Sequence, residues 1–445
     1  MLKYYFLTII ILLRISLYSQ SPNINGYNVY YGSIHNHSNF SSDAKGTPLE
    51  AFAYARDTSH LDFFGLSEHC IYLTQEKWDT LKIISQAANR DSSFTSFCGF
   101  EWTSSAKYGH ISIFNTDSFT SILDPLTDNF TEICQWIMKH NGLAFFNHPG
   151  RENGTNEEFM HFETKPIPNI VGMELWNRNI GFSHFYQNDG YSASDGNKGF
   201  YDEALIRGWR IGTEGSEDNH WANWGLYSDF RTALLAKANT KKDLLDAYWN
   251  RRFYSTLDKN LALSFMLQNS EMGDSVVEGT VLLKIEAFDV DSEVFTSVIL
   301  KRNGDTIKVW TPNSKNVSIT DSLKCVGGEY YYVIVTQEDG NQAISSPIFI
   351  KNERVSLHDT TKTNVISNHR FAISPNPFQD RISIHNYSNE TISVSLYSIT
   401  GVCVYNAELL SNSLIPISTA LFPTGCYFVK IVSDRGCELF EAYKK

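Results

Sequence analysis

The 445-residue sequence has few cysteines, and they follow no pattern of paired spacing. The seven cysteines are scattered, are odd in number and include no Cys-x-x-Cys pair, which argues against a disulfide framework. We therefore expect mostly buried free thiols. An oxidising compartment would still allow a bridge between two of the last three, Cys403, Cys426 and Cys437.

An excess of positive charge is also absent. The formal net charge is −12, and an acidic chain repels phosphate backbones, so we expect no nucleic-acid partner. Bound metal ions can nevertheless make one pocket locally cationic. The apolar content of 42% and the aromatic content of 14% are ample for folded domains, and the length suggests two to four of them.

Long apolar runs are missing as well, since the longest, Tyr4–Leu13, is too short to span a bilayer comfortably. Lys3 precedes this run, and the small and polar residues of Ser16–Gln20 follow it. This order is typical of a secretory signal peptide cleaved after Ser19. We therefore expect residues 1–19 to be removed and the mature chain, without a transmembrane segment, to be secreted or held at the outer cell surface after passing the periplasm.

Residues 28–265 alternate short apolar runs with helical patterns. Thr47-Pro48-Leu49-Glu50 is a capping box with proline at the first helical position, so a helix should begin there. The other expected helices are 75–90, 131–140 and one capped by Thr240. The expected strands are 29–34, 62–66, 95–101, 110–114, 143–147, 170–175 and 209–213. This alternation predicts an α/β fold with a largely parallel sheet or an α/β barrel.

The composition becomes strand-like after Ser270. Turns at Asn303-Gly304 and Asp339-Gly340 separate apolar runs, which predicts a small Ig-like β-sandwich over residues 270–352. Its expected strands are 281–290, 295–301, 305–310 and 330–337. Residues 353–370 are polar and are expected to form a linker.

Residues 371–445 are again all β in pattern. Ser374-Pro375-Asn376-Pro377-Phe378 is followed by the run 394–401 and then by Gly425-Cys426-Tyr427-Phe428-Val429-Lys430. The order of these motifs at the end of the chain resembles the C-terminal sorting domain of the type IX secretion system of Bacteroidota. The resemblance implies a small β-sandwich and the type IX secretion machinery as a partner. A second, generic β-sandwich is the alternative.

His35-x-His37 follows a strand pattern, and side chains at i and i+2 leave a strand on the same face. Both imidazoles can therefore reach one metal ion. Thirteen histidines in 445 positions would give roughly 0.4 such pairs by chance, so the pair alone decides little.

Further metal-ligand residues stand at the ends of successive predicted strands. They are Asp43, His69, Glu101, His110, His148, Asp218 and His220. In an α/β barrel such positions converge on the face where active sites form. A mixed set of imidazoles and carboxylates suits Zn, Mn or Fe.

The series H-x-H, Ser-Asp, acidic-His, G-x-E, G-H, N-H-P and D-x-H over residues 28–265 resembles the PHP (polymerase and histidinol phosphatase) superfamily, closest to the branch that includes carbaryl hydrolases. The resemblance implies a distorted (β/α)7 barrel that holds two or three divalent ions and is followed by the two small all-β sandwiches. Two positions depart from the family pattern. Glu68 stands where aspartate is usual, and Ala44 stands where glycine is usual.

Carried over position by position, the resemblance assigns the ligands to three groups. The first ions would be held or bridged by His35, His37, Glu101 and Asp218, with Glu101 as the bridge. A second group is His110 and His148. A third or shared group is Asp43, His69 and His220.

The resemblance implies a hydroxide that bridges two ions and attacks the substrate. Asp218 or His220 would carry the proton to the leaving group. Arg151 would contact an anionic substrate, and Glu174 and Asn177 would line the pocket.

Several of these residues have a structural alternative. Asp43 could cap a turn, His110 could be a core histidine, and Arg151 could be a surface residue. Glu174 could instead orient a ligand histidine. The histidines outside the series, His60, His140, His161 and His184, are expected to be structural or solvated, and Trp221 and Trp224 are expected to pack.

The functional prediction is a secreted metal-dependent phosphoesterase acting on a small-molecule or oligomeric ester. A carboxyl or carbamate ester hydrolase is the first alternative, because the same ligands would serve it. A non-catalytic cell-surface protein, with a degenerate scaffold and a glycan-binding or wall-binding middle sandwich, is the second.

Overall fold

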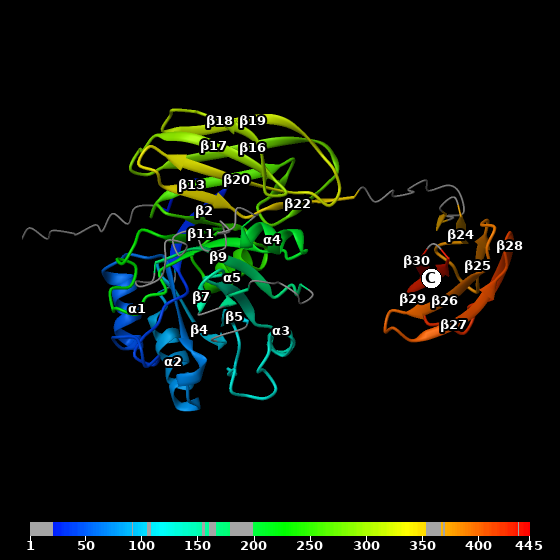
Figure 1. The fold of residues 1–445 in the computed structure, drawn as a ribbon, viewed down its shortest axis with the longest axis horizontal. Coiled ribbons are helices and arrows are strands. Elements are labelled where there is room, and N and C mark those ends of the chain that lie inside the picture. Colours follow the sequence, from blue (N-terminus) through cyan, green and yellow to red (C-terminus); the bar gives the residue numbers. More distant parts are fainter. Residues whose placement is uncertain are drawn as a thin grey trace, which may run out of the picture. The chain divides into compact units, whose positions relative to one another are not determined.

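The computed structural model divides into two compact parts, whose described residues lie within 21–352 and 366–445 (Figure 1). The described residues are 21–90, 92–104, 108–153, 156–159, 166–178, 199–352, 366–367, 370–434 and 436–445. The signal peptide expected at residues 1–19 lies outside them, as does most of the linker expected at 353–370.

One large sheet of 16 strands organises the first part. Its main path runs in the order β10 (Gly212–Ser216), β9 (Ile170–Asn177), β6 (Leu143–Asn147), β5 (Gly109–Phe114), β4 (Thr95–Ser104), β3 (Phe63–His69), β2 (Tyr27–Ser33), β11 (Arg231–Ala236), β12 (Phe253–Thr256), β21 (Gln342–Ser345), β20 (Tyr330–Gln337), β17 (Phe295–Arg302) and β18 (Asp305–Trp310). The short strands β1 (Asn23–Ile24), β15 (Ser275–Val277) and β22 (Ile348–Lys351) pair at its sides. A separate two-stranded hairpin consists of β7 (Glu152–Asn153) and β8 (Asn156–Glu157).

The predicted (β/α)7 barrel is wrong. In the part of the chain that is described, five α-helices accompany thirty strands. The described residues between β4 and β5 form no helix, and β5 runs antiparallel to both β4 and β6. β11 is likewise antiparallel to β2 and β12. Among the described strands β10 pairs with β9 alone, so the sheet does not close into a barrel and continues past β12 instead.

Polar residues cap the helices where the sequence places them. Thr47 accepts the Glu50 N–H and Glu50 caps the Thr47 N–H in return, which starts α1 (Pro48–Asp57). Thr240 caps α5 (Lys241–Trp249) in the same position. The remaining helices are α2 (Gln75–Ala88), α3 (Phe130–Lys139) and α4 (Phe200–Ile206), with one 3-10 turn at Cys70–Tyr72. Helices α1 and α2 pack against each other and against β3 and β4, and this packing holds the ends of these two strands in place.

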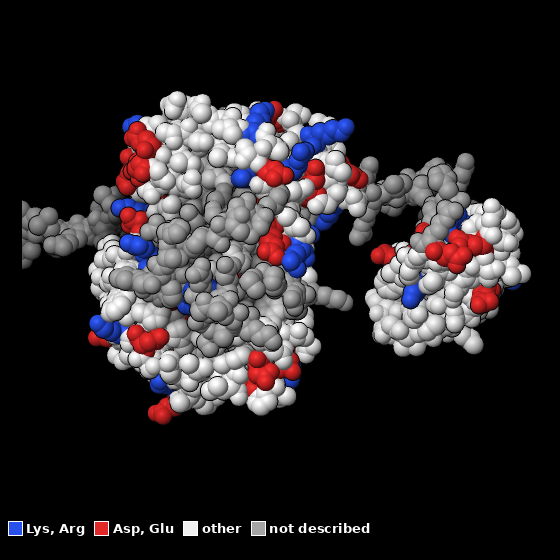
Figure 2. Space-filling view, in the orientation of Figure 1, with Lys and Arg blue, Asp and Glu red and all other residues white. Residues whose placement is uncertain are grey.

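A second sheet packs on the extension of the first. It contains β14 (Ser270–Glu271), β13 (Leu261–Leu267), β16 (Gly279–Asp289) and β19 (Asn316–Cys325). Buried residues from both sheets, among them Leu263, Ile285 and Val333, form one apolar core. Because β12 pairs with β21, the segment expected to be a separate sandwich shares a sheet with the strands before it. On the face in Figure 2, acidic and basic side chains are interspersed over these strands.

The second part of the chain contains two four-stranded antiparallel sheets. One sheet contains β23 (Ile366–Ser367), β24 (Phe371–Ser374), β25 (Arg381–Asn386) and β28 (Ser413–Ser418). The other contains β27 (Cys403–Leu409), β26 (Ile392–Ser398), β29 (Gly425–Ser433) and β30 (Gly436–Lys444). Alternate residues of both, such as Ile384, Val394 and Val429, are buried in a common core.

Asp62, which enters β3, is expected to make the stability of the first part depend on pH. Burial raises the pKa of Asp62 to about 7, and the hydrogen bond from the Tyr31 N–H opposes this rise. A raised carboxyl pKa gives stability that is complete below the unfolded value and is lost as the pH rises through 7. As the pH rises from 5 to 8, the free energy of unfolding of Asp62→Asn should therefore increase by roughly 2–4 kcal/mol relative to that of the wild type.

Denaturant unfolding at the two pH values measures this gain. Asp79→Asn, on the exposed face of α2, is the matched control and should show no such trend. An equal pH trend in the two variants would contradict the assignment to Asp62.

Candidate metal centre

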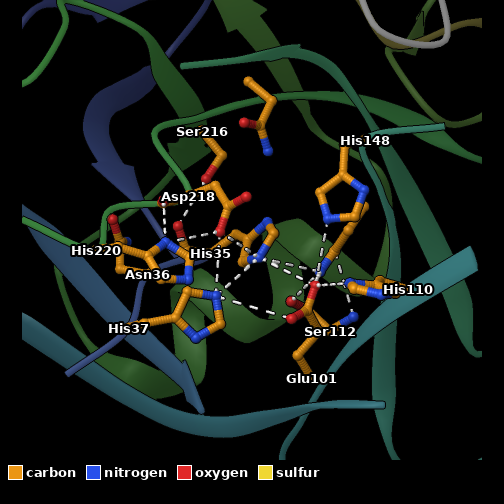
Figure 3. A network of polar contacts seen from close by, with 12 residues as sticks. His35, Asn36, His37, Glu101, His110, Ser112, His148, Ser216, Asp218 and His220 are labelled. Atoms are coloured by element: carbon orange, nitrogen blue, oxygen red, sulfur yellow. Dashed lines mark hydrogen bonds and ion pairs between the residues drawn. The ribbon is translucent and has the colours of Figure 1, made fainter. Parts of the chain in front are cut away.

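The strand ends at one edge of the large sheet bring nine side chains together, most of which are labelled in Figure 3. They are the nine residues that the sequence singled out as metal ligands: His35, His37, Asp43, His69, Glu101, His110, His148, Asp218 and His220. Eight of them are buried or nearly so, and only Asp43, with half of its side chain exposed, opens to solvent.

The first group lies just after β2. His35 Nε2 is 3.2 Å from His37 Nε2 and 3.2 Å from Asp218 Oδ1. His37 Nε2 is 3.1 Å from the same Asp218 oxygen, and Glu101 Oε1 is 3.2 Å from His35 Nε2. Two imidazole nitrogens and two carboxylate oxygens therefore face one point.

The second group shares Glu101 with the first. Glu101 Oε1 lies 3.1 Å from His110 Nδ1 and 3.4 Å from His148 Nε2. Because the same oxygen also faces His35, Glu101 stands between the two groups, as a bridging carboxylate would.

The third group consists of Asp43, His69 and His220, and it adjoins His37. The His69 and His220 rings lie 4.2 Å and 4.3 Å from the His37 ring, centroid to centroid. Asp43 Oδ2 is 3.3 Å from His69 Nε2 and 3.8 Å from His220 Nε2. His37 therefore belongs to both the first and the third group.

The donor atoms fit divalent metal ions in number, type and spacing. Ligands about 2.0–2.1 Å from a tetrahedral ion lie about 3.3 Å from one another, and the donor pairs of the first group are 3.1 to 3.2 Å apart. Glu101 Oε2 is buried and accepts no hydrogen bond of good geometry from any described residue, although His69 Nδ1 is 2.6 Å away. A buried anionic oxygen of this kind is stabilised by a cation.

Charge at the site favours the ionised form of its carboxylates and the neutral form of His37, whereas the same carboxylates outweigh the effect of burial and raise the pKa values of His35, His69 and His148. Burial alone would raise the pKa of Glu101, but the neighbouring histidines, first His110, hold it well below its usual range. Burial also acts on Asp43, yet the hydrogen bond and charge of His69 lower the pKa of Asp43 to about 2. Burial and two neighbouring histidines depress the pKa of His37. At neutral pH the carboxylates are ionised and His37 is neutral, the forms that metals bind.

Glu174, on β9, lies behind His35. Its Oε1 accepts from His35 Nδ1 at 2.6 Å, and its Oε2 accepts from the His148 backbone N–H at 2.7 Å and from Asn177 Nδ2 at 3.0 Å. The bond to Nδ1 leaves His35 Nε2 directed at the cluster. These contacts favour the orienting alternative for Glu174, and they give Asn177 a place behind the cluster as its partner.

Glu158 supports His148 in the same way. Its Oε2 lies 2.6 Å from His148 Nδ1, while its Oε1 accepts from Arg151 Nε at 2.7 Å and from Arg151 Nη2. Arg151 Nη2 also lies 3.0 Å from His110 Nε2, so the guanidinium stands at the edge of the second group rather than on the surface.

Two buried glutamates hold the loops that carry the ligands. Glu68 accepts from the backbone N–H and hydroxyl groups of Ser38 and Ser41, which fixes the loop between His37 and Asp43. The departure at position 68 thus concerns loop support and removes no donor from the cluster. Glu217 accepts the backbone N–H groups of Gly225 and Ser228, which closes the loop that follows His220.

Several supporting residues were missed by the sequence interpretation. Asn147 Nδ2 donates to Glu101 Oε1 at 2.7 Å, and its position in Asn-His-Pro, next to His148, could have indicated this. Ser41 Oγ donates to Glu68 and lies 3.2 Å from His37 Nδ1, so it orients that ring. Glu158 and Glu217 carry no local signal, because they meet their partners only through tertiary structure.

The remaining sequence candidates lie where packing places them. Cys70 is buried, His140 stacks on Trp136, and Trp224 is buried with its Nε1 donating to the His37 carbonyl. Trp221, in contrast, is 47% exposed. His161 and His184 lie outside the described residues.

Comparison with known proteins finds distant relatives of part of the chain. Uncharacterized proteins of Chlamydia muridarum and Chlamydia pneumoniae are 26% and 28% identical over 142 residues, which is 28% of this chain and 23% of each relative. The chain thus spans less than a quarter of the length of the curated relatives it matches. A solved structure from Bacteroides vulgatus, a two-domain protein containing a predicted PHP-like metal-dependent phosphoesterase, is 16% identical in sequence. The alignment covers 74% of the present chain and 97% of the Bacteroides vulgatus chain. Its TM-score of 0.43 is too low to establish a shared fold.

The end of the chain gives a clearer match. Residues 372–439 match the secretion system C-terminal sorting domain, in agreement with the resemblance seen in the sequence. In the described residues, no helix has the length and apolar character needed to cross a membrane. The sorting domain belongs to the type IX secretion system and indicates export to the cell surface or secretion.

Proposed function

We propose that this protein is an exported, metal-dependent phosphoesterase of the PHP type. One observation carries the proposal: Glu101 stands between two groups of imidazole and carboxylate donors, with Oε1 within 3.4 Å of His35, His110 and His148. Two or three Zn, Mn or Fe ions would fit the three groups.

The balance of charge supports a negatively charged substrate only with the ions in place. Glu101, Asp218 and Glu158 are buried carboxylates, and Arg151 is the arginine that contacts this set. Divalent cations would reverse the sign of the potential and attract a phosphate ester.

Each side chain then has a definite task. His35, His37, Glu101 and Asp218 would hold the ions, and Glu174 fixes the His35 ring. Bound divalent ions supply Lewis-acid chemistry, polarising the ester and making hydroxide available near neutral pH. Asp218 or His220, whose Nδ1 lies 2.8 Å from the Asp218 carbonyl, would take the proton that the attacking water releases and pass it to the departing oxygen. Arg151, at the edge of the second group, adds a cation for the phosphoryl oxygens.

A substrate panel tests the proposal. Purified mature protein supplied with Mn or Zn should hydrolyse p-nitrophenyl phosphate or bis-p-nitrophenyl phosphate faster than naphthyl acetate or a naphthyl carbamate. Strong cleavage of the carboxyl or carbamate ester, with neither phosphate substrate cleaved, would contradict the phosphoesterase proposal. It would favour a carboxyl or carbamate ester hydrolase like those of the carbaryl-cleaving branch. Fewer than about one equivalent of transition metal after gentle purification would favour a non-catalytic binding protein.

A further inference from the structure

A second cluster of acidic side chains lies in the β-sandwich, among residues that the metal centre does not use. Asp258, Asp289 and Glu293 each offer a carboxylate oxygen, and these oxygens lie within 4.8 Å of one another. Asp258 follows β12, Asp289 ends β16, and Glu293 lies in the connection to β17. Figure 2 shows acidic side chains gathered at the left end of the sandwich.

Two of these three carboxylates are buried, and none of the three has a compensating cation among the described residues. Asp258 is 9% exposed and Asp289 is 6% exposed. Across the described residues, no lysine, arginine or histidine forms a salt bridge with any of the three. The charge of Asp258 acts on the pKa of Arg231, but the Arg231 guanidinium donates its hydrogen bonds to backbone carbonyls, among them those of Gly225 and Ser228.

Buried side-chain oxygens beside these carboxylates accept no hydrogen bond from the described residues, and two of them matter for the cluster. One is Asp289 Oδ2, and the other is Oε1 of Gln337, which ends β20 and is 1% exposed. The Gln337 amide belongs to the cluster, because its Nε2 donates to Glu293 Oε2 at 2.9 Å. Buried polar atoms are nearly always satisfied by a protein group, water or an ion, so these two oxygens point to a bound species.

The carboxylates of this cluster repel one another, and this repulsion affects the pKa of Glu293. Burial, together with the charges of Asp339, Asp258 and Asp289, raises the pKa of Glu293 to about 7. Burial also raises the pKa of Asp258, and the Asp289 charge adds to the rise. Mutual repulsion of this kind is removed when a cation binds between the carboxylates.

We infer that Asp258, Asp289 and Glu293, with the Gln337 amide oxygen, form a calcium site. The donors are all oxygen, without an imidazole or thiolate, and Ca²⁺ is the hard cation that takes six to eight oxygen ligands in flexible geometry. Mg²⁺ demands near-ideal octahedral geometry and gives up its waters reluctantly, so it suits this buried set less well.

The position of the cluster gives the ion a structural role. The chain passes from the large sheet to the second sheet between β12 and β13, and it returns between β16 and β17. Asp258 stands at the first crossing, and Asp289 and Glu293 stand at the second. Gln337 ends a strand of the large sheet. A bound Ca²⁺ would therefore tie the two layers of the sandwich together.

Calcium binding to the full mature chain tests the site. After treatment with a chelator, isothermal titration with CaCl₂ should show about one equivalent bound, with affinity in the range of extracellular calcium modules. Asp289→Asn should weaken binding at least tenfold. Glu286→Gln, an exposed acid on the same strand β16, is the matched control and should bind as the wild type does. His37→Ala should also bind normally, since His37 belongs to the other cluster.

Thermal unfolding gives a second readout, because the difference in Tm between Asp289→Asn and the wild type should depend on whether Ca²⁺ is present. Saturating Ca²⁺ should raise the wild-type Tm by several degrees and leave that of Asp289→Asn nearly unchanged. Without Ca²⁺, Asp289→Asn should unfold at the wild-type temperature or above it, because one repelling charge is gone. Glu293→Gln, at a less buried position, should repeat the result if Asp289→Asn does not fold.

Three outcomes would overturn the inference. They are no calcium binding by the wild type, unchanged binding by both Asp289→Asn and Glu293→Gln, and loss of binding in His37→Ala with retention in Asp289→Asn.

Discussion

Replacing Glu101 by glutamine is expected to reduce kcat/KM for a phosphate ester by on the order of 1,000-fold. Glu101 Oε1 faces His35, His110 and His148, and its Oε2 lies 2.6 Å from His69, so one carboxylate serves donors from every group. Glutamine keeps the shape of the side chain and removes its charge, so the fold should survive while ions in the first two groups are lost. Steady-state kinetics and metal analysis of the same preparation measure both effects.

Glu158→Gln is the matched comparison for this variant. Glu158 is also a buried glutamate at the site, but it contacts His148 Nδ1 and Arg151 behind the cluster. A residue that only orients a ligand typically costs about 10–100-fold when it is changed. Equal losses in the two variants would show that Glu101 is a supporting residue and not a shared ligand.

The local structure of this protein could be predicted from its sequence because local chemistry determines it. Thr47 and Glu50 satisfy each other's backbone N–H groups wherever they occur in this spacing, and Thr240 caps α5 without help from distant residues. The apolar runs that predicted β2 to β6 consist of residues that are buried on both faces of a sheet, as the structure has them.

The topology could not be predicted, since burial on both faces does not reveal strand direction. β5 follows β4 in the chain and lies antiparallel to it, but its sequence is as apolar as that of a parallel strand. The pairing of β12 with β21 joins residues about ninety positions apart, and no periodicity signals such a contact. Most of the expected strands are therefore present, but the prediction that they close into a barrel is wrong.

The candidate site was predictable to the extent that its ligands occupy strand ends. His69 and Glu101 end the neighbouring strands β3 and β4. Asp218 follows β10, at the far end of the sheet order, and it reaches the same cluster because the segment after β10 pairs with the segment after β2. The supporting residues were not predictable. Glu158 meets His148 across a hairpin and Glu217 meets amides of its own loop, and both pairings depend on the folded backbone.

His37→Ala is expected to have an effect as large as that of Glu101→Gln, on the order of 1,000-fold in kcat/KM, together with the loss of about one metal equivalent or more. His37 is a member of two donor groups, one with His35 and Glu101 and the other with His69 and His220. The fold should remain, because its neighbours hold the backbone of this residue. The His37 N–H donates to the Asn219 carbonyl, and Trp224 Nε1 donates to the His37 carbonyl.

His140→Ala is the control, since this histidine stacks on Trp136 away from the cluster and should leave metal content and activity unchanged. The unfolding temperature in chelator separates a damaged fold from a damaged site, and wild type and His37→Ala should differ there by only a few degrees.

His220→Ala then distinguishes two ions from three. His220 takes part only in the third group, so with three ions it should lose about one equivalent and keep the Glu101-centred pair. If His220→Ala keeps the full metal content, two ions suffice, and His220 remains as the proton donor proposed beside Asp218. A His37→Ala protein with full metal content would exclude a ligand role for the residue that joins the two groups.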